Sequence, residues 1–90
     1  MAEEALEFFN KTGLEGKETL CKEVVTYAFK KYKDCYDIAK YIQERFKSAF
    51  KNDRWCVFTF KIDEGSGFAD YKNTFIGINY AGFKTCILNN

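Results

Sequence analysis

Apolar side chains in the first part of the chain repeat with the period of an α-helix. From about Lys17 they fall at i, i+4, i+7, i+8 and i+11, at Cys21, Val25, Ala28, Phe29 and Tyr32. Charged residues such as Lys22, Glu23, Lys30 and Lys31 stay outside this stripe. This spacing predicts an amphipathic helix with one buried face.

A second helix is predicted after a break at Lys33-Asp34. Asp34 is a residue that helices favour as an N-cap, and Asp37 follows in the first turn, where negative charge suits the helix dipole. One face of this helix is apolar and consists of Ile38, Ala39, Ile42, Phe46, Ala49 and Phe50. The pattern ends near residues 51–53.

Beyond residue 54 the pattern changes to a period of two, which predicts strands. Cys56, Phe58 and Phe60 alternate with Trp55, Val57 and Thr59. The predicted strands are Ala5–Asn10, Trp55–Ile62, a short Phe68–Tyr71, Thr74–Tyr80 and Phe83–Leu88. Gly-rich residues 63–67 and the pair Ala81-Gly82 predict turns. The predicted order is β-α-α-β-β-β-β in a single domain, 1–90, an α+β fold with two helices on an antiparallel sheet.

Composition excludes several classes of function. The 90 residues include no histidine, so neither a Ser-His-Asp triad nor a histidine metal ligand is available. The net charge of +1 and a pI near 7.6 give no case for nucleic-acid binding. No apolar run approaches the ~18 residues of a membrane span. We therefore expect no nucleic acid and no membrane insertion.

The four cysteines form no C-x-x-C motif and predict no metal site. Cys21, Cys35, Cys56 and Cys86 are far apart in sequence, and reduced thiols packed as small apolar groups are the simplest interpretation. Cys56 follows Trp55 and Arg54, where a nearby cation would lower a thiol pKa, but a packed cysteine is the favoured alternative. We expect no catalytic residue, no cofactor and no enzymatic activity.

The chain resembles the eight-kilodalton cytoplasmic dynein light chains over roughly Glu7 to Leu88. The most specific stretch is Tyr32 followed by Asp37-Ile38-Ala39, Phe46, Phe50 and Trp55-Cys56. Gly65-Ser66, Phe75-Ile76 and Gly82 fall near the family's positions with one-residue insertions. The combination over almost the whole chain carries the resemblance.

The resemblance implies a strand-swapped homodimer that binds linear peptides. Each subunit would donate a short strand, here Phe68, Ala69, Asp70 and Tyr71, and a peptide would add beside it by backbone pairing. The implied partners are peptide segments of other proteins, such as dynein intermediate chain, in the cytoplasm and on the cytoskeleton. The implied groove also includes Cys35, Tyr36, Phe75, Gly77, Asn79 and Ile87. The implied interface contains Trp55, Cys56, Phe68 and Tyr71.

Departures from the family pattern affect the predicted groove. Cys35 and Tyr36 stand where the family has a Glu-Lys pair that contacts a glutamine of the peptide. Gly77 and Asn79 replace groove tyrosines. We therefore expect a shallower groove with a changed peptide preference. The family's interface histidine is missing, with Cys56 or a neighbour in its place, so we expect a dimer that acid does not weaken.

A second interpretation stays open at this point. A similar module ends certain flatworm tegumental calcium-binding proteins, after a pair of EF-hands. In that case the chain is a dimerisation domain whose groove is diverged or empty. The pair Cys35-Tyr36 favours this alternative, and EF-hand loops upstream of Met1 would decide it.

Overall fold

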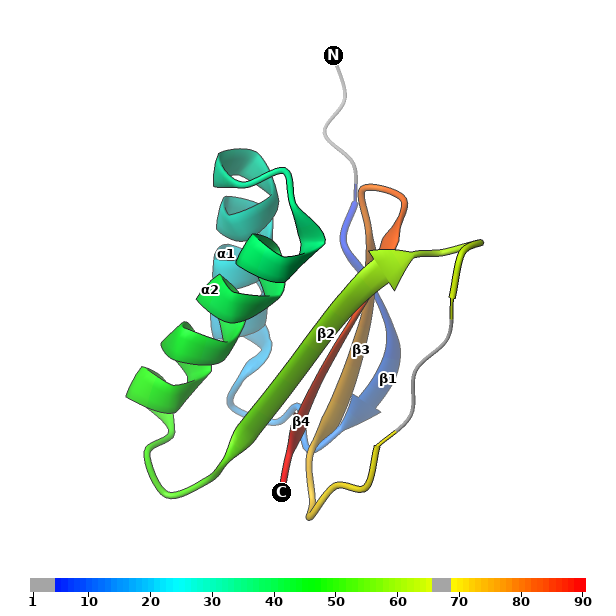
Figure 1. Cartoon of the computed structure of the whole chain (residues 1–90). Coiled ribbons are helices and arrows are strands. Elements are labelled where there is room, and N and C mark those ends of the chain that lie inside the picture. The colour runs from blue at the N-terminus through cyan, green and yellow to red at the C-terminus, as the bar shows by residue number, and fades with distance from the viewer. Residues whose placement is uncertain (1–4, 66–68) are drawn as a thin grey trace.

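The computed structural model describes residues 5–65 and 69–90. Two helices cover one face of a four-stranded sheet, and the other face carries no helix (Figure 1). In chain order the elements are β1 (Glu7–Thr12), α1 (Glu18–Lys31), α2 (Cys35–Ala49), β2 (Trp55–Lys61), β3 (Phe75–Tyr80) and β4 (Phe83–Asn89). The α+β class and the two helices are confirmed, and the observed order is β-α-α-β-β-β.

The sheet has the order β1-β3-β4-β2, and all neighbouring strands are antiparallel. A two-residue turn joins β3 to β4, and both of its residues, Ala81 and Gly82, have positive φ, 55° and 81°. Such turns match the right-handed twist of the flanking strands, with Tyr80 paired to Phe83 across them. In this strand order β2 is an edge strand and β3 is a central one, so the long connection between them runs from the edge of the sheet to its middle.

The helices bury most of the faces that the sequence predicts, although Ala49, expected on the apolar face of α2, is exposed. α1 buries Cys21, Val24, Val25 and Ala28, and α2 buries Ile38, Ile42 and Phe46. Asp34 occupies the N-cap position of α2 with an extended backbone, although its side chain makes no capping hydrogen bond. The predicted cap is thus correct in position.

Trp55 anchors the start of β2 beneath α2. Its indole N–H donates to the carbonyl oxygen of Phe50 at 3.1 Å, and its ring lies 5.0 Å from that of Phe46. Only 4% of Trp55 is exposed. The helix-side core also contains Ile76, Ile78 and Ile87 of the sheet.

A second apolar cluster lies on the helix-free face of the sheet. Phe75, Cys86 and Leu88 are buried there, and Cys56, Phe58 and Ala69 pack against them. The predicted alternation of β2 and β3 is therefore confirmed, because odd and even positions belong to different clusters.

The predicted short strand over Phe68–Tyr71 is absent from the part of that segment that the structure describes. Residues 69–71 have no strand conformation, and Phe68 lies outside the described residues. They belong to the connection between β2 and β3, where β4 already occupies the position between those two strands. A strand here needs a free sheet edge, and only β1 and β2 offer one.

Polar contacts fix the end of this connection. The Asn89 side chain accepts hydrogen bonds from the backbone N–H groups of Asn73 and Thr74, at 3.1 and 2.8 Å, and donates to Asn73 Oδ1 at 2.7 Å. Asn89 is 1% exposed.

None of the described helices is long and apolar enough to cross a membrane.

Candidate binding site at the edge strand β2

The outer edge of β2 has a short stretch of backbone without a strand partner. Gln43 Nε2 donates to the Trp55 carbonyl oxygen at 2.7 Å, so this carbonyl points away from β4. The residue that faces Trp55 on β4 is Asn89. Its backbone C=O accepts from the N–H of Lys72 and its N–H donates to the C=O of Thr74, so neither group bonds to β2. Because the pairing direction alternates along an antiparallel pair, Val57 and Thr59 also point their N–H and C=O groups outward.

Contacts at both ends limit this open stretch. At one end, the Gln43 side chain donates a hydrogen bond to the Trp55 carbonyl oxygen. At the other end, the N–H of Glu64 donates to the Lys61 carbonyl oxygen at 3.0 Å. Among residues 5–65 and 69–90, β4 is the only strand that pairs with β2. The four backbone groups of Val57 and Thr59 are therefore available to a short added strand.

The opposite edge of the sheet, β1, is less suited to strand addition. Its pairing with β3 shifts register between Phe8 and Asn10. Asn10 Oδ1 also accepts hydrogen bonds from the backbone N–H and the hydroxyl of Thr12, at 3.0 and 2.8 Å. A bulge and a local side-chain contact are devices that blunt an edge. The edge of β2 pairs regularly over its seven residues and has no such irregularity.

A groove of about 330 Å³ runs between α2 and β2. Figure 1 shows α2 lying along the edge strand. The groove is lined by Tyr36, Ala39, Lys40, Gln43, Glu44, Lys47 and Val57. An extended chain at the edge of β2 would pass beneath this face of α2.

The residues predicted at the start of the second helix lie at one end of this groove. Tyr36 is 69% exposed and lines the groove. Cys35 is the first residue of α2 and is half-buried. The structure thus places Tyr36 in the same groove as Val57 of the edge strand.

The other predicted groove residues divide between the two faces of the sheet. Phe75 and Gly77 lie on the helix-free face, and Asn79 shares their parity on β3. Ile87 is fully buried beneath the helices and contributes no surface in this chain. Ala69 packs against the helix-free cluster, whereas Asp70 is exposed. These residues therefore do not form one continuous surface in a single chain.

The residues predicted at a dimer interface also lie in different environments. Cys56 is half-buried on the helix-free face, and Tyr71 is 42% exposed with its ring 5.4 Å from that of Phe75. Trp55 is buried under α2 and stabilises the chain's own core. Phe68 lies outside the described residues.

Six lining residues were not predicted as groove residues from the sequence: Ala39, Lys40, Gln43, Glu44, Lys47 and Val57. On α2 the polar positions 36, 40, 43 and 47 follow helical spacing and lie apart from the buried stripe of Ile38, Ile42 and Phe46. That spacing was available in the sequence. Which element this polar face adjoins depends on the tertiary arrangement.

Cys21 and Cys86 are poor nucleophiles, because burial disfavours the thiolate form. Burial raises the pKa of Cys21 to about 12 and that of Cys86 to about 11. All four cysteines are free. Within the described ranges, no group of three or more His, Cys, Asp or Glu side chains is placed to hold a metal ion.

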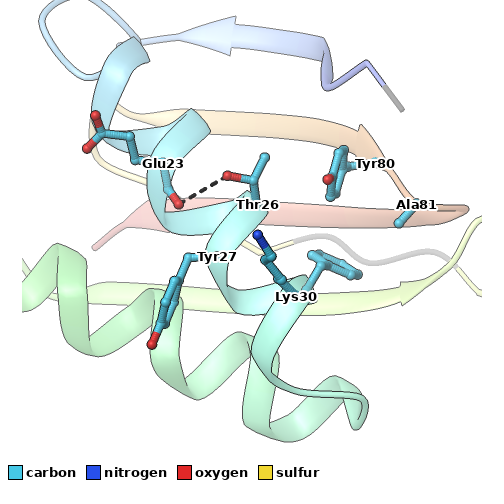
Figure 2. Close-up of a pocket in the computed structure, with 7 residues that line it drawn as sticks. Glu23, Thr26, Tyr27, Lys30, Tyr80 and Ala81 are labelled. Atoms are coloured by element: carbon cyan, nitrogen blue, oxygen red, sulfur yellow. Dashed lines mark hydrogen bonds between the residues drawn. The ribbon is translucent and has the colours of Figure 1, made fainter. Parts of the chain in front are cut away.

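A larger hollow, about 750 Å³, lies between α1 and the β3–β4 turn (Figure 2). Glu23, Thr26 and Lys30 follow one another along α1, and Tyr80 and Ala81 face them from the hairpin. Phe29 and Tyr80 meet edge to face at 5.5 Å. This hollow adjoins no open strand edge, so it is separate from the groove beside β2.

Comparison with known proteins adds no family to this geometry. No family model matches the chain, and no curated protein matches it. The dynein light chain resemblance therefore remains a proposal that rests on residues and geometry.

Proposed function

We propose that the chain is a non-enzymatic, dimeric interaction module of the dynein light chain kind that binds linear peptides by strand addition. The observation that carries the proposal is the open edge of β2, at Val57 and Thr59, beside the α2 groove. Backbone pairing at such an edge supplies affinity, and neighbouring side chains supply selectivity.

The helix-free face supports dimerisation. Phe58 and Phe60 stack on it with ring centroids 6.3 Å apart, beside the cluster that contains Cys56 and Leu88. One covered face and one apolar uncovered face are typical of a sheet that packs against a second layer. A second copy of the chain is the proposed layer.

The exchanged strand is part of this proposal. The segment Phe68–Tyr71 has four residues, a length that suits the short open stretch between Gln43 and the Lys61 turn. In the proposed dimer this segment of one copy pairs with β2 of the other, and a target peptide adds beside it under α2. The proposed setting is cytoplasmic and cytoskeletal, with dynein intermediate chain among the candidate partners.

Sedimentation equilibrium with Thr59→Pro tests the proposal. Proline removes an outward N–H that the added strand needs, so the variant should dissociate at concentrations where the wild type is dimeric. Lys22→Ala on the exposed face of α1, away from the edge of β2 and from the helix-free face, is the control and should leave the dimer intact. A wild-type monomer at tens of micromolar would contradict the proposal.

One observation favours the alternative of a dimerisation domain from a larger calcium-binding protein. The exposed residue Tyr36 lines the groove, at a position where dynein light chains have a lysine that contacts the peptide. A dimer that binds no extended peptide in calorimetry would support this alternative over the peptide-binding module.

A further inference from the structure

The wall of the groove beside β2 carries more positive than negative charge. Lys40, Glu44 and Lys47 are the charged residues that line it, and all three are exposed. In the described part of the chain, salt bridges within 4.0 Å join Lys22 to Glu18 and Lys61 to Glu64, and none involves the two groove lysines. Both ammonium groups are therefore available to an anionic ligand.

The spacing of the two lysines fits an extended peptide. They are seven residues apart on α2, which separates their backbone positions by about 10.5 Å along the helix axis. Two strand residues on one face are about 6.8 Å apart, and residues four apart are about 13.6 Å apart. The lysine spacing lies between these two strand spacings, and flexible lysine side chains can make up the remaining distance in both cases. Carboxylates two or four positions apart in the peptide can therefore reach both ammonium groups.

The backbone beside the groove restricts the kind of anion. In the proposed dimer the exchanged strand pairs with Val57 and Thr59, and its own outer edge presents N–H and C=O groups, which a peptide strand satisfies and a free phosphate does not. Tyr36 adds a hydroxyl and an aromatic ring at one end of the groove. Hydrogen-bonding backbone on one side and lysines on the other describe a site for an acidic strand.

We infer that the groove between α2 and β2 selects acidic linear peptides, with carboxylates two or four residues apart on the face toward α2. The inference rests on the proposed function and names the chemistry of its partner. Lys40 and Lys47 each contact a carboxylate of the bound peptide.

The experiment compares two fluorescein-labelled peptides by anisotropy at about 50 mM salt. One has the sequence Thr-Glu-Val-Glu-Val-Glu-Thr, and the other has glutamine at each glutamate position. We expect the acidic peptide to bind at least tenfold more tightly, equivalent to about 1.4 kcal/mol. The preference should shrink in 1 M salt, where charges on an exposed surface are screened.

Variants of exposed lysines locate the effect. Lys40→Gln and Lys47→Gln should each reduce the preference at least threefold, and the double variant should abolish it. Lys30→Gln removes the same charge from the hollow beside α1 and should leave the preference unchanged. If Lys30→Gln lowers it as much as the groove variants do, net charge explains the preference and the inference is wrong.

The remaining outcomes separate the inference from the function on which it rests. Equal affinity for the two peptides would overturn the acidic selectivity and leave strand addition intact. Binding of neither peptide by the dimeric protein would overturn the proposed peptide binding itself.

Discussion

The ring of Phe9 on β1 lies directly over Gly77 on β3. A β-carbon built on Gly77 would overlap the Phe9 ring. The ammonium group of Lys84, a residue of β4, lies 5.1 Å from the centre of the same ring. The two residues join the outermost strand β1 to its neighbour on the helix-free face. Glycine at position 77 therefore has a packing role in this chain.

Replacing Gly77 tests this packing. Gly77→Ala should displace the Phe9 ring, which is 44% exposed and can move outward, and lower the free energy of unfolding by about 1 kcal/mol. In a Phe9→Ala background the same change should be neutral or stabilising, because alanine is better than glycine in a strand. Urea unfolding of the four proteins measures the coupling. Equal effects of Gly77→Ala in both backgrounds would show that Phe9 does not matter.

Asn89 should contribute strongly to the free energy of unfolding, because its side chain fixes the end of the connection between β2 and β3. Asn89→Ala leaves the buried N–H of Thr74 and the N–H of Asn73 without their acceptor. We expect a loss of roughly 2–4 kcal/mol, because each unsatisfied buried group costs about 1–3 kcal/mol. The exposed neighbour provides the control, and Asn90→Ala should change stability by less than about 0.5 kcal/mol. A similar small effect for both variants would contradict this role.

Buried thiols should make the protein less stable in alkali. A thiol in the unfolded chain has a pKa of about 8.5, whereas burial raises the pKa of Cys21 to about 12. The unfolded state therefore loses its proton first, and the stabilisation present below about pH 8.5 is lost as pH rises toward 12. Cys21→Ala should show a flatter decline of unfolding free energy between pH 9 and 11. Parallel curves for the variant and the wild type would be the contrary result.

Acid should leave the proposed dimer intact between pH 7 and 5. That range is where a histidine titrates, and the chain has none. Sedimentation velocity at several pH values and a fixed concentration measures the dimer fraction. A dimer–monomer transition centred near pH 6 would mean that another group controls association.

Glutamine-centred peptides should bind weakly. Without the family's Glu-Lys pair at positions 35 and 36, the peptide amide loses its contacts at the start of α2, and an unpaired buried amide costs about 1–3 kcal/mol. We expect a Thr-Gln-Thr peptide to bind at least tenfold more weakly than to a typical dynein light chain in titration calorimetry. The double change Cys35→Glu and Tyr36→Lys should restore affinity. If it does not, Gly77 and Asn79 are the next residues to change.

The sequence by itself determined the local elements of this protein. Its helical stripe at Cys21, Val25 and Ala28 and its alternation through Cys56 and Phe58 predicted the helices, the strand and the faces they bury. Most boundaries agree within one or two residues, as for the strand predicted at Ala5–Asn10 and found at Glu7–Thr12, whereas α2 ends at Ala49, before the predicted end near residues 51–53. Periodicity succeeds here because each element has one buried side, so local spacing records which side faces the core.

Only the tertiary structure decided where the candidate site lies. Lys40 and Lys47 are ordinary solvent-facing lysines in the sequence, and they become groove residues because α2 packs along β2. Phe68–Tyr71 has the pattern of a strand, but its described residues, 69–71, form none in this chain. A strand requires hydrogen bonds to a neighbouring edge, and periodicity carries no information about which edge is free. Long-range pairing, which places β4 between β2 and β3, leaves the edge of β2 open.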